Sequence, residues 1–530
     1  MQKLLLTLTI VFNSFSLFSQ ESLNLELLGT YPFDDIQRSQ KLNDIWGYVD
    51  ESGDEYALIG LTTGFSIVAI DQGDTPVEVV RIPGPTSTWR DIKTYGDYAF
   101  VVHDNITGEG NTQALLVVDL TDIENGNAPY YSFTDSNRFS RAHNIYIDEN
   151  GIAYLTGADF SNGGAYMIDV TNPDSLFTVG VFDDFYFHDC VTRGDTMWGG
   201  AIYEGSLMAI DVSDKQYPTI LGFEYTPTLF THNCWFSDDG NYIYTTDEKT
   251  DAFIASYDVS DVGNIKFQDK IQSYYSEQTI PHNTHFLNQY LITSYYRDGL
   301  QITDVQYPDN MIDVGHYDTS PLYEGNGFNG AWGAYPYLPS GKILVSDMEN
   351  GLFIFKPKYE RACYLHITVV DDLTGQNVLG AKINVLNTID SMGISGILKT
   401  GTPIPGNYNL IASKKDYATQ TINVNLSNNS ITEIEVRLTS APFFDEIDPS
   451  SIEFGPNPTT NNVTIFSPGS IKGPFNIEVY DMLGRLVNKT TLPNLNNENP
   501  IDLPNTSGEY VVKIIDTHSK KHIERKIVKL

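Results

Sequence analysis

The stretch Thr231 to Val259, THNCWFSDDGNYIYTTDEKTDAFIASYDV, contains the pattern on which most of the chain is built. It begins with a short extended run, His232 to Phe236, and turns at Ser237 to Gly240, where Asp and Gly tolerate tight backbone angles. A second strand, Tyr242 to Thr246, and a third that ends at Asp258 follow at short intervals. This spacing predicts an antiparallel meander of short strands.

The same unit recurs along the chain in aligned columns. The third strands read GFSIVAID, QALLVVDL, GGAYMIDV, GSLMAIDV, AFIASYDV, DGLQITDV and NGLFIFK, and the second strands repeat in step with them, which makes seven units. Repeats of this length are typical of propeller blades. A glycine-containing fourth strand follows most units but not the seventh, whereas ELLGTY around Gly29 precedes the first. The sequence therefore predicts an all-β chain with a seven-bladed β-propeller closed by the N-terminal strand.

Composition and charge narrow the classes of protein. Aromatic residues make up 12% of the chain, with 33 tyrosines, as expected for many short strands. A formal net charge of −36 argues against nucleic acid or an anionic membrane as partner, since both require basic patches. Only 3 cysteines occur, an odd number that does not make a disulfide framework. With 530 residues, the chain is too long for one core and should divide into several domains.

The N-terminus has the layout of a secretory signal peptide over residues 1–19. It carries Lys3, an apolar stretch from Leu4 to Phe12 and small residues near Ser19, so that cleavage would expose Gln20. No later run is long and apolar enough to span a bilayer. We expect an exported mature chain without a transmembrane segment.

Short motifs connect residues 20–357 to a known family. They are WRDIK from Trp89, AHNI from Ala142, HDC from His188, THNCW from Thr231, PHNTH from Pro281 and GAWGAYPYLPSGKILVSD from Gly330. Through them this part resembles the LVIVD-repeat β-propellers of the choice-of-anchor B family. The resemblance implies an exported propeller joined to varied C-terminal anchors, without a settled biochemical activity.

Two small β-sandwich domains are expected after the propeller. Residues 361–440 resemble the carboxypeptidase regulatory-like, prealbumin-like domains through Thr374-Gly375, Gly380-Ala381 and Pro405-Gly406. That resemblance implies a spacer or a binding accessory. A linker at 441–451 then leads to the last domain.

Residues 452–530 resemble the type A C-terminal sorting domain of the type IX secretion system. The motifs that carry this resemblance are Pro456-Asn457-Pro458, the turn from Tyr480 to Arg485, Gly508-Glu509-Tyr510 and the terminal Lys529-Leu530. It implies that the type IX secretion machinery is a partner, and that the chain crosses the outer membrane to the cell surface or is released.

Four histidines share one offset at the entries to successive units. His143, His188, His232 and His282 are separated by 45, 44 and 50 residues. In a propeller the first strand of each blade lines the central channel, so equal offsets should converge near the axis. Imidazole suits Zn, Cu, Fe or Ni, and the four residues are therefore candidate ligands of a transition metal such as Cu, Fe or Zn.

The surroundings of these histidines leave other interpretations open. Each is followed by Asn or Asp, but neighbouring residues of a strand point to opposite faces, which argues against these residues as partners of the imidazoles. The histidines could instead form hydrogen bonds between blades or to channel water, as a structural feature copied with the repeat. Trp46, Trp89 and Trp332 at other blade entries are expected in the core or in an aromatic rim.

Two hypotheses for the function follow. The first is an exported cell-surface or secreted propeller that acts as a ligand- or partner-binding scaffold for a surface protein or glycan, and it predicts no bound transition metal. The alternative is a metal-dependent, oxidoreductase-like enzyme that uses the four-histidine site. No Gly-x-Ser-x-Gly elbow follows a strand, no catalytic residue is assigned, and the sequence leaves open whether the protein is an enzyme.

Overall fold

The computed structural model of the protein describes residues 22–70, 75–105, 114–135, 139–160, 162–273, 278–440, 451–517 and 520–530. The predicted signal peptide at 1–19 and nearly all of the predicted linker at 441–451 lie outside these ranges. The described residues form strands and one short 3₁₀ helix, Ile123–Asn125, so the expectation of an all-β chain is confirmed. Within these ranges, no helix has the length and apolar character needed to cross a membrane.

The chain divides into two compact units. The first comprises Met1–Tyr364 with Thr400–Gly406 and Leu426–Thr432, and the second holds the remainder. Because strands of the small domain after the propeller contribute to both, this division does not coincide with the boundaries predicted from the sequence.

Antiparallel sheets of four strands, or five in one case, make up the first unit. In spatial order they are β3 (Leu42–Val49), β4 (Glu55–Leu61), β5 (Gly64–Ala69) and β6 (Val77–Pro83); β7 (Ile92–Tyr95), β8 (Tyr98–Val102), β9 (Leu115–Asp119) and β10 (Tyr130–Phe133); β11 (Asn144–Ile147), β12 (Ile152–Thr156), β13 (Ala165–Asp169) and β14 (Phe177–Phe182); β15 (Cys190–Arg193), β16 (Thr196–Ala201), β17 (Ser206–Asp211) and β18 (Thr219–Tyr225); β19 (Thr231–Phe236), β20 (Tyr242–Asp247), β21 (Ile254–Asp258) and β22 (Lys266–Ile271); β23 (Thr284–Leu287), β24 (Tyr290–Ser294), β25 (Leu300–Asp304), β26 (Ile312–Tyr317) and β1 (Ser22–Leu23); and β27 (Ala331–Tyr335), β28 (Ile343–Asp347), β29 (Gly351–Pro357) and β2 (Leu25–Tyr31).

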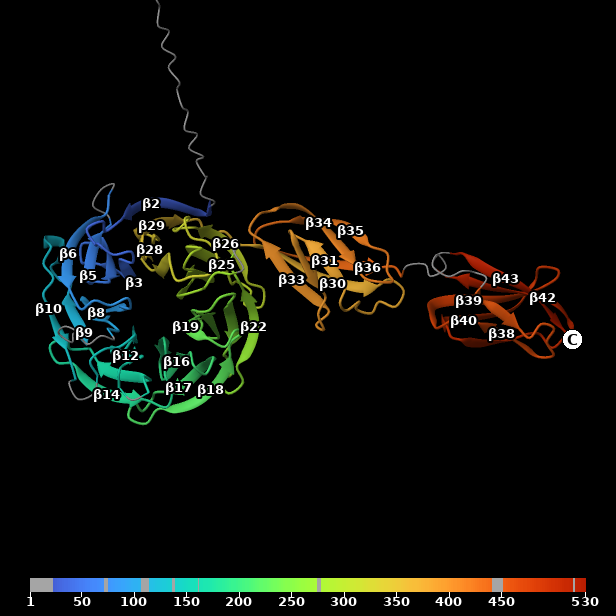
Figure 1. Ribbon diagram of the computed structural model, residues 1–530, viewed down its shortest axis with the longest axis horizontal. Coiled ribbons are helices and arrows are strands. Elements are labelled where there is room, and N and C mark those ends of the chain that lie inside the picture. The colour runs from blue at the N-terminus through green and yellow to red at the C-terminus, as the bar shows by residue number, and fades with distance from the viewer. Residues whose placement is uncertain are drawn as a thin grey trace, which may run out of the picture. The chain divides into compact units, whose positions relative to one another are not determined.

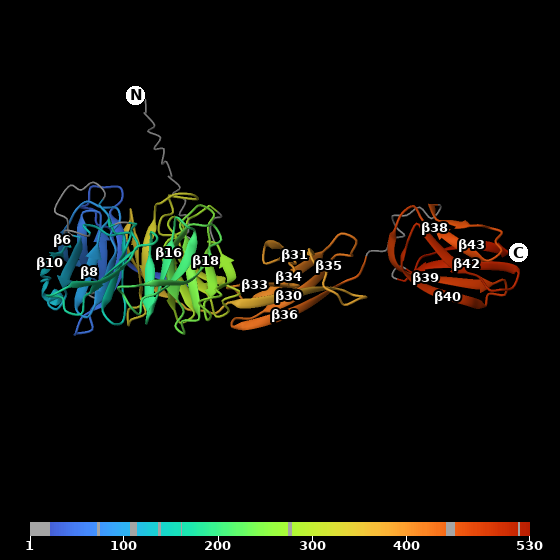
Figure 2. The same ribbon diagram turned by 90° about the horizontal axis from the view of Figure 1, so that it is seen from below.

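These sheets surround a common axis, with strands such as β6, β14 and β22 at the perimeter (Figure 1). From the side, their strands run between the two faces of the ring (Figure 2). The last of the sheets combines both ends of the unit, because β2 pairs with β29 from Leu25↔Pro357 to Tyr31↔Leu352.

The aspartates that end the third strands β9, β13, β17, β21 and β25 form the turns that follow these strands. The Asp211 carboxylate accepts the Ser213 backbone N–H at 2.8 Å, and Asp258 accepts the Ser260 N–H at 3.0 Å. These are turns in which a short carboxylate binds the backbone two residues on. The repeated Asp in the sequence therefore marks the end of the strand rather than a chemical site.

The glycine of the outer strand allows neighbouring sheets to approach each other. Gly180 of β14 lies beside a β-bulge in the pairing of β13 with β14. A Cβ atom on Gly180 would lie 1.7 Å from the Lys215 carbonyl oxygen of the next sheet. The glycine is needed here for close contact between sheets, which explains its recurrence in the fourth-strand column.

The hydrophobic core of the first unit lies between adjacent sheets. One cluster joins Val102 of β8 to Leu155 of β12, and the next joins Tyr154 of β12 to Met197 of β16. All four side chains are fully buried. Each sheet is therefore stabilised by its two neighbours, and the first strands are fixed around the channel.

Four smaller sheets follow the first unit. In spatial order they are β33 (Ile397–Thr402), β30 (Cys363–Asp371) and β36 (Ser430–Leu438); β32 (Thr388–Ser391), β31 (Lys382–Val385), β34 (Gly406–Ser413) and β35 (Gln420–Leu426); β37 (Glu453–Gly455), β38 (Asn462–Phe466) and β41 (Glu498–Asp502); and β40 (Leu486–Leu495), β39 (Ile471–Asp481), β42 (Gly508–Asp516) and β43 (His522–Lys529). The last two share one core cluster that includes Val463, Ile477 and Ile514.

Candidate functional site

The four predicted histidines lie at the beginning of the first strands of successive sheets. His232 is the second residue of β19, and the other three precede β11, β15 and β23 by one or two residues. Their backbones are held alike: the N–H groups of His143, His188 and His282 donate to Thr156 O, Gly200 O and Ser294 O of the second strands, at 2.9–3.0 Å. Equal offsets in the sequence thus become equal levels along the channel.

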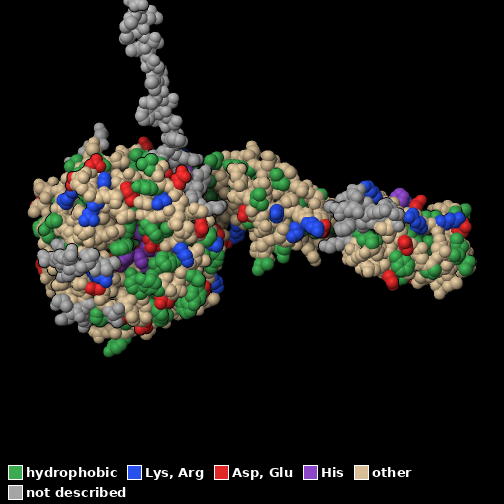
Figure 3. Space-filling view, viewed as in Figure 1, with side chains coloured by type: hydrophobic (Ala, Val, Ile, Leu, Met, Phe, Trp, Pro, Cys, Tyr) green, Lys and Arg blue, Asp and Glu red, His purple; other side chains and the backbone are tan. Residues whose placement is uncertain are grey.

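The imidazoles form a continuous row. Ring centroids are 4.1 Å apart for His143 and His188, 4.1 Å for His188 and His232, and 4.5 Å for His232 and His282. The structure therefore places each predicted residue beside the next. Histidine side chains are visible near the centre of the face shown in Figure 3. His143 and His188 are partly exposed, whereas His232 and His282 are buried.

Three of the four imidazoles are oriented through Nδ1. His143 Nδ1 lies 3.1 Å from Asp104 Oδ2, His188 Nδ1 lies 2.9 Å from Asp189 Oδ1, and His282 Nδ1 contacts the Trp332 carbonyl oxygen. A carboxylate or carbonyl at Nδ1 fixes the tautomer in which Nε2 is the free ligand atom, as is usual around metal-bound histidines.

His232 differs from the other three. Its side chain is 2% exposed, yet neither ring nitrogen has a hydrogen-bond partner among the described residues. A buried polar group without a partner destabilises a fold by about 1–3 kcal/mol, so such groups require an explanation. Contact of the ring with a water molecule or a bound ion would provide such an explanation.

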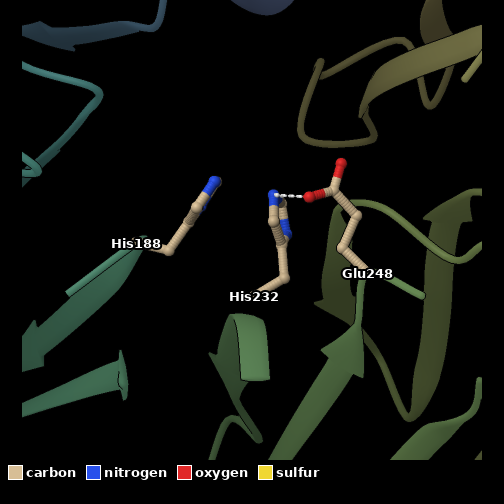
Figure 4. Close-up of side chains that lie close together, drawn as sticks. All are labelled: His188, His232 and Glu248. Carbon is tan, nitrogen blue, oxygen red and sulfur yellow. Dashed lines mark ion pairs between the residues drawn. The ribbon is translucent and has the colours of Figure 1, made fainter. Parts of the chain in front are cut away.

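A carboxylate that the sequence interpretation missed completes the cluster. Glu248, just after β20, lies with its oxygens 3.8 Å from His232 Nε2 and 3.8 Å from His282 Nε2. Figure 4 shows the Glu248 side chain pointing toward His232, with His188 on the other side. Glu248 also accepts a hydrogen bond of 2.7 Å from the Tyr296 hydroxyl.

Three residues of the cluster satisfy a geometric requirement for metal binding. One ligand atom each of His188, His232 and Glu248 lies within 4.8 Å of the others. Tetrahedral ligand atoms about 2.0–2.1 Å from a shared zinc ion would be roughly 3.3 Å apart, so only side-chain adjustment separates the observed positions from coordination. His143 and His282 extend the row at either end but do not belong to this closest set.

The protonation states favour neutral imidazoles. Burial and the neighbouring His188 and His282 hold the pKa of His232 well below its usual range, and burial lowers the pKa of His282 to about 4. Burial raises the pKa of Glu248 to about 7. Since only a neutral imidazole binds a metal, His232 and His282 are ready to act as ligands at neutral pH.

The Asp and Asn residues that follow the histidines form a second polar layer, and one of them behaves differently from the expectation. Asn144 donates to Asp91, and Asn233 donates to Asp189 at 2.9 Å, in contacts between sheets. The argument from strand alternation against these residues as partners of the imidazoles fails for Asp189, which lies 2.9 Å from His188 Nδ1. His188 and Asp189 precede β15, so the alternation of strand side chains does not apply to them.

The three tryptophans at blade entries occupy different levels. Trp89 and Trp332 line the histidine level together with His143 and His282, around a cavity of about 20 Å³, enough for a water or an ion. Trp46 lies farther along the channel, with its ring 5.9 Å from that of His285. His285 packs against Trp235 at 4.4 Å, away from the four-histidine row.

Comparisons with known proteins identify one part of the chain. Residues 454–529 match the family described as the secretion system C-terminal sorting domain. This match indicates export by type IX secretion, with the protein secreted or at the cell surface, and implies interaction with that secretion machinery.

The remaining comparisons concern the fold. Among solved structures, the β-propeller domain of Cps50 (Swd1) from Myceliophteria thermophila is similar, with a TM-score of 0.42 and 12% identity over 61% of this chain and 98% of that chain. No curated protein matches the chain.

Proposed function

We propose that this chain is an exported seven-bladed β-propeller that acts as a ligand-binding scaffold at the cell surface or after release. Export is supported by the sorting domain at 454–529. The blade count is supported by the sheets around one axis, and closure by the N-terminal strand is supported by the pairing of β2 with β29. Membership of the choice-of-anchor B family and a regulatory-like domain at 361–440 are part of the same proposal.

The ligand at the face with the histidine row is, in this proposal, a transition-metal ion such as Cu, Fe or Zn. The observation that carries it is the buried imidazole of His232, which has no hydrogen-bond partner among the described residues and lies between two other imidazoles and Glu248. A purely structural histidine would be expected to use at least one ring nitrogen. His188, His232 and Glu248 would hold the ion, and His143 or His282 would complete its coordination.

Elemental analysis of the purified mature chain tests this proposal. The protein is stripped with a chelator, reloaded separately with Cu, Fe or Zn, and desalted. We expect about one equivalent of at least one metal to remain bound. Folded protein that retains none of the three would refute the metal proposal and leave the histidines as structural residues.

One observation favours an enzymatic alternative. Glu248, whose pKa burial raises to about 7, faces the cluster and is hydrogen-bonded by Tyr296. A carboxyl group that titrates near neutral pH is suited to proton transfer, so a metal-dependent oxidoreductase is the second candidate. In this alternative the four histidines hold the metal without Glu248. Oxygen uptake by metal-loaded protein in the presence of a reductant, lost in Glu248→Gln while the metal stays bound, would support it, and no uptake with any of the three metals would exclude it.

A further inference from the structure

The channel has a second cavity, which belongs to neither the histidine row nor the proposed metal site. It has a volume of about 300 Å³ and is lined by Trp46, Tyr146, Trp235, Tyr337, Lys93 and Arg193, among others. A small polar cavity of about 10 Å³ lies against both sites: it shares Asp189 and Asn283 with the histidine level, and Tyr146 and Trp235 with the larger cavity. The larger cavity is therefore farther along the same channel.

Aromatic rings from four different sheets form an arc around this cavity. The centroid of Tyr337 lies 6.4 Å from that of Trp46 and 6.3 Å from that of Trp235, and Tyr146 lies 5.9 Å from Trp235. These side chains come from the first strands or directly follow one, so the sheets fix them rigidly. They give the cavity a largely aromatic wall.

Polar groups with unused hydrogen-bonding capacity stand beside the arc. Arg193 uses Nη1 to donate to the carbonyl oxygens of Ser237 at 3.0 Å and Asp238 at 3.2 Å, and its guanidinium lies 4.5 Å from the Phe236 ring. Among the described residues, Nε and Nη2 of Arg193, the Asp238 carboxylate and the Tyr146 hydroxyl have no hydrogen-bond partner. Arg193 is thus held in place with two parallel donors free.

These features favour a ligand that carries both a carboxylate and hydroxyl groups over simpler ligands. A cation is disfavoured by Arg193 and by Lys93, whose ammonium is fixed 2.8 Å from Asp91 and 4.5 Å from the centroid of Trp46. A purely apolar molecule would make no use of the free groups of Arg193 and Asp238, which are exposed to water. An aromatic acid would satisfy Arg193 but would bring no hydroxyl donors for Asp238.

We propose that this cavity binds an acidic sugar, a pyranose ring that carries a carboxylate. The aromatic arc would take the apolar face of the ring, and the free donors of Arg193 would bind the carboxylate through two parallel hydrogen bonds. Asp238 and Tyr146 would bind ring hydroxyls. The volume lies at the lower end of about 300–1,000 Å³ typical of small-molecule sites, which suits a terminal unit of an acidic glycan.

The proposal specifies a ligand for the scaffold function proposed above, but it does not depend on the metal. The test is a titration of the mature full-length chain, separately with glucuronate, a short oligouronide, glucose and benzoate. Binding is measured by tryptophan fluorescence and by calorimetry. We expect the uronates to bind and to change the tryptophan emission, and glucose to bind at least tenfold more weakly.

Arg193 and Asp238 are both exposed, so substitutions of these residues should leave the protein folded and test the site itself. Arg193→Gln should weaken uronate binding at least tenfold and abolish the preference over glucose, and Asp238→Asn should weaken uronate and glucose alike. His232→Gln, at the other level of the channel, should bind uronate as the wild type does even if it loses metal. No uronate binding at millimolar concentration, equal binding of benzoate, or binding that is unchanged in Arg193→Gln would each overturn the proposal.

Discussion

Lowering the pH from 7 to 5 should destabilise the first unit, because its buried histidines are neutral. The substitution His285→Gln measures how much of this loss of stability is due to His285. His285 is 5% exposed and packs against Trp235 at a centroid distance of 4.4 Å. Burial, followed by the nearby Lys93, lowers its pKa to about 3. In the unfolded chain the same imidazole should titrate near its ordinary value of about 6.5.

The sign and size of the effect follow from proton linkage. Between these two pKa values the unfolded state binds the proton and the folded state does not, so stability is lost as the pH falls below about 6.5. Going from pH 7 to pH 5, one such histidine lowers the free energy of unfolding by about 2 kcal/mol. The size depends mainly on the unfolded pKa, because the folded pKa lies below the whole interval.

Urea unfolding followed by tryptophan fluorescence measures this effect. The five tryptophans, Trp46, Trp89, Trp198, Trp235 and Trp332, all lie in the first unit, so their emission reports on that unit. With a chelator present, His285→Gln should lose about 2 kcal/mol less than the wild type between pH 7 and 5. His522→Gln, in the second unit, should match the wild type. Equal losses in wild type and His285→Gln would refute the reasoning.

Three further predictions concern the metal, the export signal and the contacts between sheets. His232→Ala should abolish stoichiometric binding of Cu, Fe or Zn in elemental analysis. Asp104→Asn, which replaces the carboxylate beside His143 Nδ1 by a neutral amide, should weaken binding about 10–100-fold, whereas His316→Ala in β26 should leave it intact. Deletion of 452–530 should leave the first unit folded by tryptophan fluorescence but absent from the cell surface; normal surface levels of the shortened chain would contradict the role of the sorting domain. Gly180→Ala should lower the free energy of unfolding by about 1–3 kcal/mol, because its Cβ would meet the Lys215 carbonyl. Gly263→Ala, whose Cβ would be 3.5 Å from the nearest atom, should change the melting temperature little. Similar melting temperatures for the two variants would contradict the packing argument.

The all-β fold and the histidine row could be predicted because both depend on the repeat. Equal positions in equal units become equal positions around an axis, so His143, His188, His232 and His282 could be placed beside one another from spacing alone. The carboxylates could not be placed in this way. Glu248 and Asp104 occupy the same position of the repeat, six residues after the first residue of a second strand, Tyr242 or Tyr98. Other units carry Ile202, Tyr296 or Met348 at this position, so the column has no common residue type that marks a ligand, and only the tertiary structure shows that it faces the histidines.

The aromatic cavity also could not be predicted from the sequence. Trp46 and Trp89 both stand at blade entries, and no motif in the sequence indicates the level of the channel at which each ring lies. Within a unit, the residue at the level of this cavity stands three residues after the histidine, as Tyr146 does after His143 and Trp235 after His232. A shift of this size is within the error in predicted strand boundaries.

The pairing of β2 with β29 also has a consequence for how the protein is made. The two strands stand at opposite ends of the first unit, with Leu25 paired to Pro357, so the last sheet cannot form until nearly the whole unit has left the ribosome and any translocation pore. Until then the edges of β2 and β29 remain unpaired. Bringing together two strands separated by more than 300 residues costs about 5 kcal/mol of chain entropy. The pairing of β2 with β29 should therefore slow the last step of folding. It should also slow unfolding, since a local opening elsewhere in the ring leaves this strand pair intact.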